Sequence, residues 1–288
     1  MKNTFFKHFR SVCILFMSTL FLLTGCSHES NPSNNILTVT VLKVGKADAI
    51  AVLSNDHALL IDTGEEDDGE EVVDFLKKHS ISTVDAMIIT HFDQDHVGGA
   101  DTVIENLDVK DIYVPDYEGT HLEYVDFMST VENSSASLHR LDEAVSFSFV
   151  DSSILIEPPA SYEIEDNTCD YDNNFSLITT ITHGKNRFVF TGDAEKQRIR
   201  EWLQGDSATE CNFLKVPHHG VYNKALEELF QTLNPDVSVI CDSQKHPAEV
   251  KTLEKLHSYC PNIYETKDGD ITVISNGETL ECTQKIKK

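Results

Sequence analysis

The chain has 288 residues, of which 40% are hydrophobic and 25% are charged, a composition typical of a globular protein with a buried core. Acidic residues outnumber basic ones, 48 against 23, for a formal net charge of −25. Because proteins that bind phosphate backbones by charge are basic, we expect no stable nucleic-acid binding, although a bound divalent cation reverses the sign of the charge locally.

The first 35 residues have the pattern of an export signal followed by a tether. Three basic residues precede an apolar stretch, residues 11–23, that is short for a membrane span. The stretch leads into Leu-Thr-Gly-Cys, which resembles the lipobox of bacterial lipoproteins. We therefore expect a signal peptide over residues 1–25, a lipid on Cys26 and a tether over residues 26–35. The rest of the chain is then extracytoplasmic and lipid-anchored to the cell membrane; an ordinary secretory peptide or an uncleaved signal anchor is the alternative.

Beyond the tether, the hydrophobic pattern predicts a meander of strands followed by alternating helices and strands, and this order occurs twice. In the first half, the predicted strands are 36–44, 48–53, 58–64, 84–90 and 111–115, and the predicted helices are 68–79, 100–107 and 121–133. In the second half, the predicted strands are 145–150, 153–157, 175–184, 187–193, 212–216 and 236–242, the predicted helices are 194–203, 224–233 and 248–259, and two short strands close the chain. Two β-rich halves that are each covered by helices favour one α/β/β/α sandwich over residues 36–288.

Five cysteines lie beyond the signal and the lipobox: Cys169, Cys211, Cys241, Cys260 and Cys282. They lack C-x-x-C spacing, so a zinc knuckle is not expected. An odd number leaves at least one thiol unpaired outside the cytoplasm, and we expect buried free thiols, with one disulfide within the set as the alternative.

The segment HFDQDH, residues 91–96, follows a buried predicted strand and precedes a Gly-Gly pair. Strand ends are where α/β proteins expose functional groups. His91, Asp93, Asp95 and His96 place four possible ligands within six residues, and such groups repel or stay idle without a cation. The segment therefore predicts a metal site, with a solvated acidic turn as the alternative.

The H-x-D-x-D-H pattern, followed by Val-Gly-Gly, resembles a known family. The metallo-β-lactamase superfamily carries H-x-H-x-D-H at this place, and the variant with Asp93 for the second His resembles the extracytoplasmic domain of the ComEC competence family. It is also similar to phosphorylcholine esterases of the superfamily. Five further segments occur in the family's order: VGKADAI, LLIDTG, DNNFSLI, FTGD and LKVPHHG. The resemblance covers the chain beyond the tether and implies a four-layer αββα metallo-β-lactamase sandwich, in a stand-alone lipoprotein form.

The resemblance also implies two divalent metal ions, zinc or manganese, that share Asp193. For the first ion it implies the ligands His91, Asp93, Asp193 and Asn174, with Asn173 as an alternative to Asn174. For the second ion it implies Asp95, His96, Asp193 and His218. A carboxylate in place of the second His makes the first position richer in oxygen, which favours harder ions such as manganese over zinc.

Three more residues are expected to assist. Asp62 would orient a liganding imidazole from behind, His219 would bind substrate phosphate or give up a proton, and His246 would lie near the active cleft. The expected catalytic set is Asp95, Asp193 and His219. The alternatives are a helix cap for Asp193, a turn former for Asp62 and spectator roles for His219 and His246. The histidines that match no motif are expected to be structural or on the surface: His28, His57, His79, His121, His139, His183 and His257.

The sequence therefore predicts a metal-dependent hydrolase in which a hydroxide that bridges two cations attacks the substrate. The resemblance implies a phosphodiester, in nucleic acid or in a phosphate-bearing envelope polymer such as a phosphorylcholine ester. The alternatives are hydrolysis of a carbon ester, lactone or β-lactam at the same site, or a lipid-anchored binding module with a vestigial metal site.

The chain departs from the ComEC pattern in three ways. It contains no multi-span channel region, so it is not expected to transport DNA by itself. Val221 stands where the family often has Ser, and Lys46-Ala47 replace a common Gln-Gly. The last two differences bear on the substrate pocket more than on the metal site.

Overall fold

The computed structural model describes residues 35–162 and 171–286. The expected signal peptide, the lipidation site at Cys26 and all of the tether except residue 35 lie outside these residues, as do His28 and Cys169. Within the two described ranges, no helix is both long and apolar enough to cross a membrane. The four described cysteines are free thiols; Cys211, Cys241 and Cys260 are buried and Cys282 is partly exposed.

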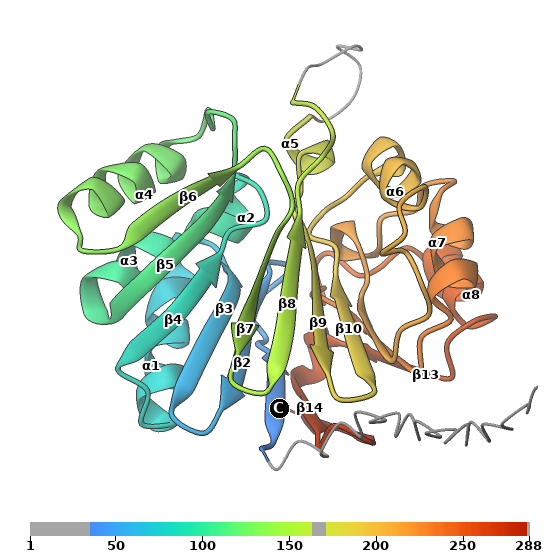
Figure 1. Ribbon diagram of the computed structural model, residues 1–288. Helices are drawn as coiled ribbons and strands as arrows, with labels where there is room; N and C mark the ends of the chain where they lie inside the picture. The colour runs from blue at the N-terminus through green and yellow to red at the C-terminus, as the bar shows by residue number, and fades with distance from the viewer. Residues whose placement is uncertain (1–34, 163–170, 287–288) are drawn as a thin grey trace, which may run out of the picture. The chain divides into compact units, whose positions relative to one another are not determined.

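The first sheet has eight strands in the order β15-β14-β1-β2-β3-β4-β5-β6 (Figure 1). The strands are β1 Leu37–Val41, β2 Ala49–Ser54, β3 His57–Thr63, β4 Thr83–Ile88, β5 Asp108–Pro115, β6 Ser137–Leu141, β14 Gly269–Ser275 and β15 Leu280–Ile286. Its helices are η1 Glu66–Asp68, α1 Gly69–Lys78, α2 Gln94–Val97, α3 Ala100–Asn106 and α4 Leu122–Asn133. β1, β2 and β3 form an antiparallel meander and β3 to β6 run parallel, while the late hairpin β14–β15 returns to pair with β1.

The second sheet repeats this plan with seven strands in the order β13-β12-β11-β10-β9-β8-β7. The strands are β7 Val145–Phe149, β8 Ser152–Glu157, β9 Ile178–His183, β10 Asn186–Phe190, β11 Phe213–Lys215, β12 Val237–Ile240 and β13 Asn262–Glu265. The helices are α5 Tyr171–Asn174, α6 Lys196–Trp202, η2 His218–Gly220, α7 Leu226–Leu233, α8 Val250–Leu256 and η3 Thr266–Asp268. β7 to β10 are antiparallel and β10 to β13 are parallel.

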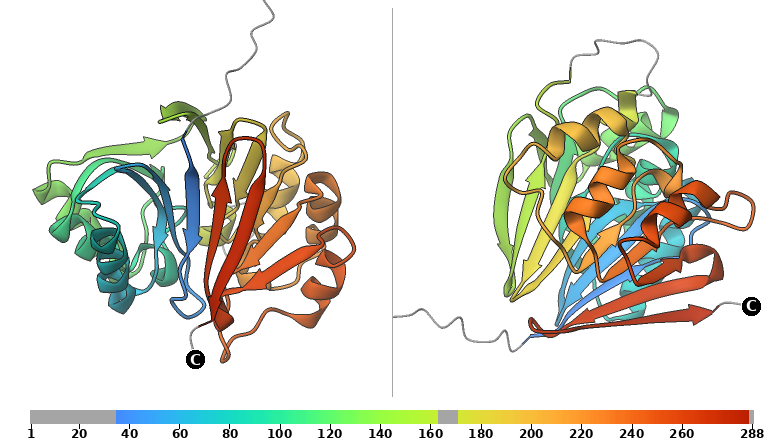
Figure 2. Two further views of the ribbon diagram at one scale, coloured as in Figure 1. Left: turned by 90° about the horizontal axis from the view of Figure 1, so that it is seen from below. Right: turned by 90° about the vertical axis from the view of Figure 1, so that its right-hand side faces the viewer.

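Three apolar layers separate the four layers of secondary structure. Seen along the sheets, the two sheets face each other and helices cover both outer faces (Figure 2). Val72, Val103 and Phe127 belong to the layer under α1, α3 and α4, Ile88 and Phe188 to the layer between the sheets, and Trp202, Phe230 and Leu256 to the layer under α6, α7 and α8. The αββα sandwich expected from the sequence is confirmed.

The amphipathic helix α1 illustrates how the sequence produces these layers. Val72, Val73 and Leu76 recur at helical spacing and are buried, whereas Glu70 and Glu71 in the first turn are exposed. Acidic residues in the first turn and lysines in the last turn also complement the helix dipole. Burial of one apolar stripe therefore fixes α1 against the first sheet.

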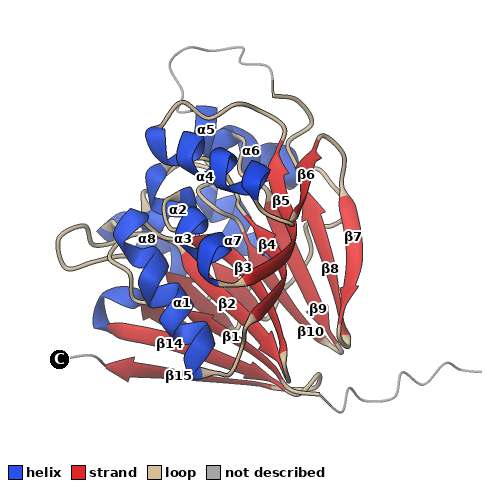
Figure 3. Cartoon of the chain, turned by 90° about the vertical axis from the view of Figure 1, so that its left-hand side faces the viewer, coloured by secondary structure: helices blue, strands red, loops and turns tan. Residues whose placement is uncertain are grey.

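Both sheets direct their functional loops to one edge. β3 and β4 run parallel in the first sheet, and β10 and β11 run parallel in the second. β2 is antiparallel to β3, with Ala49 paired to Thr63, so the start of β2 meets the end of β3. Figure 3 shows α2 and α5 at the same end of the strands. The segments before β2 and after β3, β4, β10 and β11 are thus brought together.

Candidate metal centre

Two residues separate β4 from the segment His91–His96, which Asp62 contacts from the side away from the site. The Asp62 carboxylate accepts hydrogen bonds from the Thr90 backbone N–H and hydroxyl, both at 2.7 Å, and lies 2.8 Å from His96 Nδ1. The Thr90 hydroxyl oxygen lies 3.1 Å from His91 Nδ1. Asp62 has a left-handed backbone, φ 57°, which is strained for a residue other than glycine. The Nδ1 atoms of both rings take part in this network, so only their Nε2 atoms remain for a ligand.

The tight turn after β11 separates the two adjacent histidines. His219 Nδ1 lies 3.1 Å from the Cys241 carbonyl oxygen, which can only accept, so Nδ1 carries the hydrogen and Nε2 faces forward. His218 points elsewhere; its Nδ1 lies 3.3 Å from Glu195 Oε1, and its side chain is 24% exposed. Both residues have positive φ angles, 48° and 52°. The turn thus brings His219 rather than the expected ligand His218 to the centre.

The Asp193 carboxylate contacts the rings of both His96 and His219. Its carboxylate oxygens lie 3.3 Å from His96 Nε2 and 2.9 Å from His219 Nε2, and Asp95 Oδ2 lies 3.2 Å from the same His219 nitrogen. Gly192 allows the Asp193 turn to approach β4 closely, because a Cβ atom there would lie 2.8 Å from the Thr90 side chain. Asp193 therefore lies between the ligands of the two halves, as a shared carboxylate requires.

The residues present fit a metal ion. The Nε2 atoms of His91, His96 and His219 are buried and make no aligned hydrogen bond. Leaving one buried polar atom unsatisfied costs about 1–3 kcal/mol, and three such nitrogens converge on carboxylates here. Imidazole nitrogens fixed by a hydrogen bond at the opposite ring atom, together with carboxylates, are the usual ligands of zinc and manganese.

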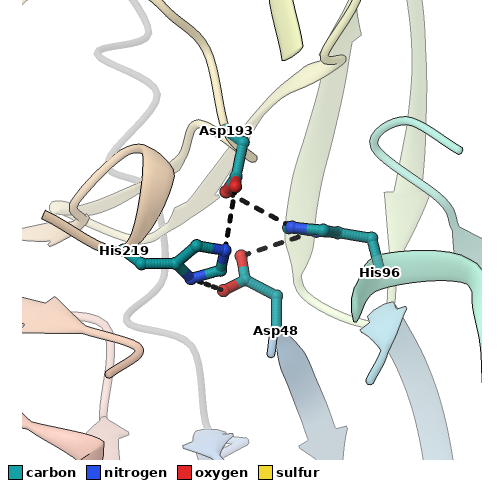
Figure 4. Close-up of side chains that lie close together, drawn as sticks. All are labelled: Asp48, His96, Asp193 and His219. Atoms are coloured by element: carbon teal, nitrogen blue, oxygen red, sulfur yellow. Dashed lines mark ion pairs between the residues drawn. The ribbon is translucent and has the colours of Figure 1, made fainter. Parts of the chain in front are cut away.

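Asp48 and Lys215 lie against this site, and sequence reasoning gave neither of them a role. Asp48, His96, Asp193 and His219 present ligand atoms that all lie within 4.8 Å of one another, with Asp193 and Asp48 on opposite sides of the two rings (Figure 4). We call these four residues the deep cluster. Lys215 is fully buried, contacts the Asp48 carboxylate, and donates to Gly192 O at 2.9 Å. The only indication of Lys215 in the sequence was its position within the apolar run that precedes His-His-Gly.

The charges of the deep cluster are strongly coupled. Burial lowers the pKa of His219, but Asp193 and Asp95 outweigh it and raise that pKa to about 9. Asp193, Asp62 and Asp48 raise the pKa of the buried His96 well above its usual value. Burial raises the pKa of Asp193, but the two rings and Lys215 hold it well below its usual range. Without a cation the rings therefore carry protons that balance the carboxylates, and a bound cation would displace them.

Two further expected residues lie outside this arrangement. The Asn174 amide oxygen accepts a hydrogen bond from the Arg198 backbone N–H at 3.1 Å, near the start of α6. His246 is exposed in a turn in which its backbone N–H bonds to Ser243. Asp172, Asn173 and Asn174 form a helical turn, and β9 begins only at Ile178, later than the predicted strand.

Comparison with known proteins agrees with this fold. Residues 42–166 match the profile of a family described as the metallo-beta-lactamase superfamily. The chain is 24% identical over 276 residues to ComE operon protein 3 of Bacillus subtilis, which covers 88% of this chain and 34% of that protein. It is 24% identical over 255 residues to Recombination protein 2 of Haemophilus influenzae, which covers 85% of this chain and 30% of that protein. The chain thus spans about a third of the length of these relatives.

A solved structure supports the same fold. The metallo-beta-lactamase fold protein YhfI from Bacillus subtilis has a TM-score of 0.56 with this chain, at 11% identity. The match covers 86% of this chain and all of that one. At this identity, the likeness establishes the fold alone.

Proposed function

We propose that this chain is a ComEC-like member of the metallo-β-lactamase superfamily and an extracytoplasmic phosphodiesterase that works with two divalent cations. The fold and the site are those of a metal-dependent hydrolase. The observation that best supports the proposal is the convergence of three buried imidazole nitrogens, none with an aligned hydrogen bond, on the carboxylates of Asp93, Asp95 and Asp193.

The side chains around the site each have a definite task in this proposal. When bound, the cations lower the pKa of water and balance the negative charge that develops on a phosphoryl group. Asp62 and the Cys241 carbonyl hold the His96 and His219 rings with Nε2 forward. Lys215 balances the charge of Asp48 behind the rings, so that Asp193 stays ionised and able to hold a cation.

Lys46 supplies a cation at the rim of the site. Its ammonium nitrogen lies 2.5 Å from Asp95 Oδ2, and its side chain is 39% exposed. A side chain that reaches both the site and the solvent can exchange Asp95 for a substrate phosphate once a metal ion occupies that carboxylate. Lys46 therefore favours a phosphate ester over an uncharged ester or lactam.

The metals and the location complete the proposal. Asp93 makes one position richer in oxygen, which favours manganese there, whereas zinc suits the deep cluster with its two imidazoles. A lipid on Cys26 would hold the enzyme at the outer surface of the cell membrane, where phosphate-bearing envelope polymers and extracellular nucleic acid are within reach. The bulk charge of −25 makes long nucleic acid the less favoured of these substrates.

A metal-by-substrate screen on the full-length chain in detergent tests the activity. The substrates are a bis-aryl phosphate, a mono-aryl phosphate, single-stranded DNA, a phosphorylcholine ester and a chromogenic β-lactam, each with manganese or zinc. We expect turnover of the bis-aryl phosphate that is lost with a chelator and in Asp95→Ala, but kept in the surface variant Asp111→Ala. Turnover of the β-lactam alone would contradict the proposal.

The location is tested separately by membrane fractionation with labelled fatty acid. We expect the wild-type chain to carry the label and to sediment with membranes, and Cys26→Ser to lose both properties. A Cys26→Ser chain that still carries the label would show that the lipid is attached at another residue.

A further inference from the structure

A second group of ligand-type side chains lies beside the deep cluster. Asp93, His121 and Asp172 present ligand atoms that all lie within 4.8 Å of one another, and His121 Nε2 lies 3.8 Å from Asp93 Oδ1. These residues come from three separate segments: the loop after β4, the N-terminal boundary of α4 and the helical turn α5. We call these three residues the outer group. The fold therefore assembles a His and two carboxylates that the sequence keeps far apart.

A buried histidine nitrogen is directed at the same carboxylate from inside. His91 Nε2 is fully buried, makes no aligned hydrogen bond and lies 3.5 Å from Asp93 Oδ2. Asp93 thus presents one oxygen to His91 and the other to His121. Because a buried, unsatisfied imidazole nitrogen is costly, this second observation independently calls for a ligand at Asp93.

Asp172 is oriented as metal-binding carboxylates usually are. The Tyr117 hydroxyl accepts the Phe92 backbone N–H at 2.9 Å and hydrogen-bonds to Asp172. A carboxylate can only accept, so the Tyr117 hydroxyl donates this hydrogen bond to Asp172. A hydrogen bond of this kind fixes a liganding carboxylate and tunes its affinity.

We propose that Asp172 and His121, together with Asp93 and His91, form the outer metal position of this protein. The assignment rests on the proposed two-metal function and gives Asp172 and His121 the role expected for Asn174. Two carboxylates and two imidazoles carry the charge that balances one divalent cation, and a donor set this rich in oxygen suits manganese.

The outer position differs from the deep cluster in access. The Asp93 side chain is 23% exposed and that of His121 is 42% exposed, whereas the rings of His96 and His219 are buried. Ligands that are exposed to solvent hold an ion less tightly than ligands fixed in a buried site. The outer ion therefore exchanges with the medium, while the deep ion stays bound.

Manganese binding to the full-length chain tests this assignment without using activity. Equilibrium dialysis gives the number of ions bound, and electron paramagnetic resonance detects the magnetic coupling of two neighbouring ions. We expect two ions in the wild type, and in Asp172→Asn and His121→Gln a dissociation constant of the weaker ion raised at least tenfold with loss of the coupled signal. His121 is partly exposed, so His121→Gln leaves folding intact even if Asp172→Asn does not.

Two control variants make the result decisive. His139→Gln removes an equally exposed histidine that pairs with Asp111 at 2.7 Å, and Asn174→Ala removes the ligand expected from the sequence. Both should bind two manganese ions as the wild type does. Two unchanged ions in the Asp172→Asn and His121→Gln variants would overturn the outer position alone, whereas a wild type that binds no metal would overturn the proposed function itself.

Discussion

The deep cluster and the outer group lie side by side but are built by different means. All four residues of the deep cluster are buried, and Asp62, Cys241 and Lys215 fix them from behind. The outer group has half-exposed members, and Tyr117 supports one of them. Buried ligands that are held by hydrogen bonds and ion pairs bind an ion more tightly than ligands that are exposed to solvent. The difference predicts that the deep cluster binds its ion more tightly than the outer group does.

The largest predicted effect on activity is at Asp193, which lies between the two histidines of the deep cluster. Asp193→Asn keeps the shape but removes the charge that faces His96 and His219. We expect kcat/KM for the phosphodiester to fall by about a thousandfold or more, because an electrostatic contribution of several kcal/mol is lost. Steady-state kinetics with saturating manganese measure this, with Asp111→Asn as the surface control. Activity within tenfold of the wild type would rule out Asp193 as a shared ligand.

The adjacent histidines after β11, His218 and His219, give the next largest predicted effect on activity. We expect His219→Ala to lose the tightly bound ion and about a hundredfold or more of the activity, because its buried ring faces Asp95 and Asp193. His218→Ala should keep both ions, since its ring pairs with Glu195 outside the cluster. Elemental analysis after gel filtration distinguishes the two variants. Loss of metal from His218→Ala alone would restore the ligand set expected from the sequence.

Lys215 tests whether the deep cluster is held by charge. Lys215→Met leaves Asp48 buried beside the rings without its ammonium partner. Breaking a buried ion pair on one side costs about 3–5 kcal/mol, so the free energy of unfolding of the chelated protein should fall by roughly this amount. Urea denaturation followed by circular dichroism gives the value. The double variant Asp48→Asn with Lys215→Met should recover much of the loss, and no recovery would show that Lys215 acts through packing.

Local pattern was sufficient to predict the fold and half of the site. The strand periodicity and the cluster of ligands in six residues, His91 to His96, are local properties, and Asp193 marks the end of a strand. Asp48, His121 and Asp172 could not be found this way, because only the folded chain brings them to the site. The choice between two neighbouring histidines depended on a turn with positive φ angles, which residue types alone do not determine.

Asp68 offers the smallest effect and a baseline for both clusters, because it is a half-buried carboxylate that belongs to neither of them. Burial raises its pKa from 3.8 to about 6, which outweighs the hydrogen bond from the Glu65 N–H at 2.8 Å. A raised pKa in the folded state means that its contribution to stability is full below pH 4 and is lost as the pH rises through 6. Asp68→Asn keeps the acceptor and removes the charge, so it should stabilise the chelated protein by about 1 kcal/mol at pH 8, after allowance for solvent screening, and by almost nothing at pH 4. Urea denaturation at both pH values measures the difference. An equal effect at the two pH values would mean that charge is not its cause. The stability changes predicted for charge variants of the two clusters would then also need an explanation from packing.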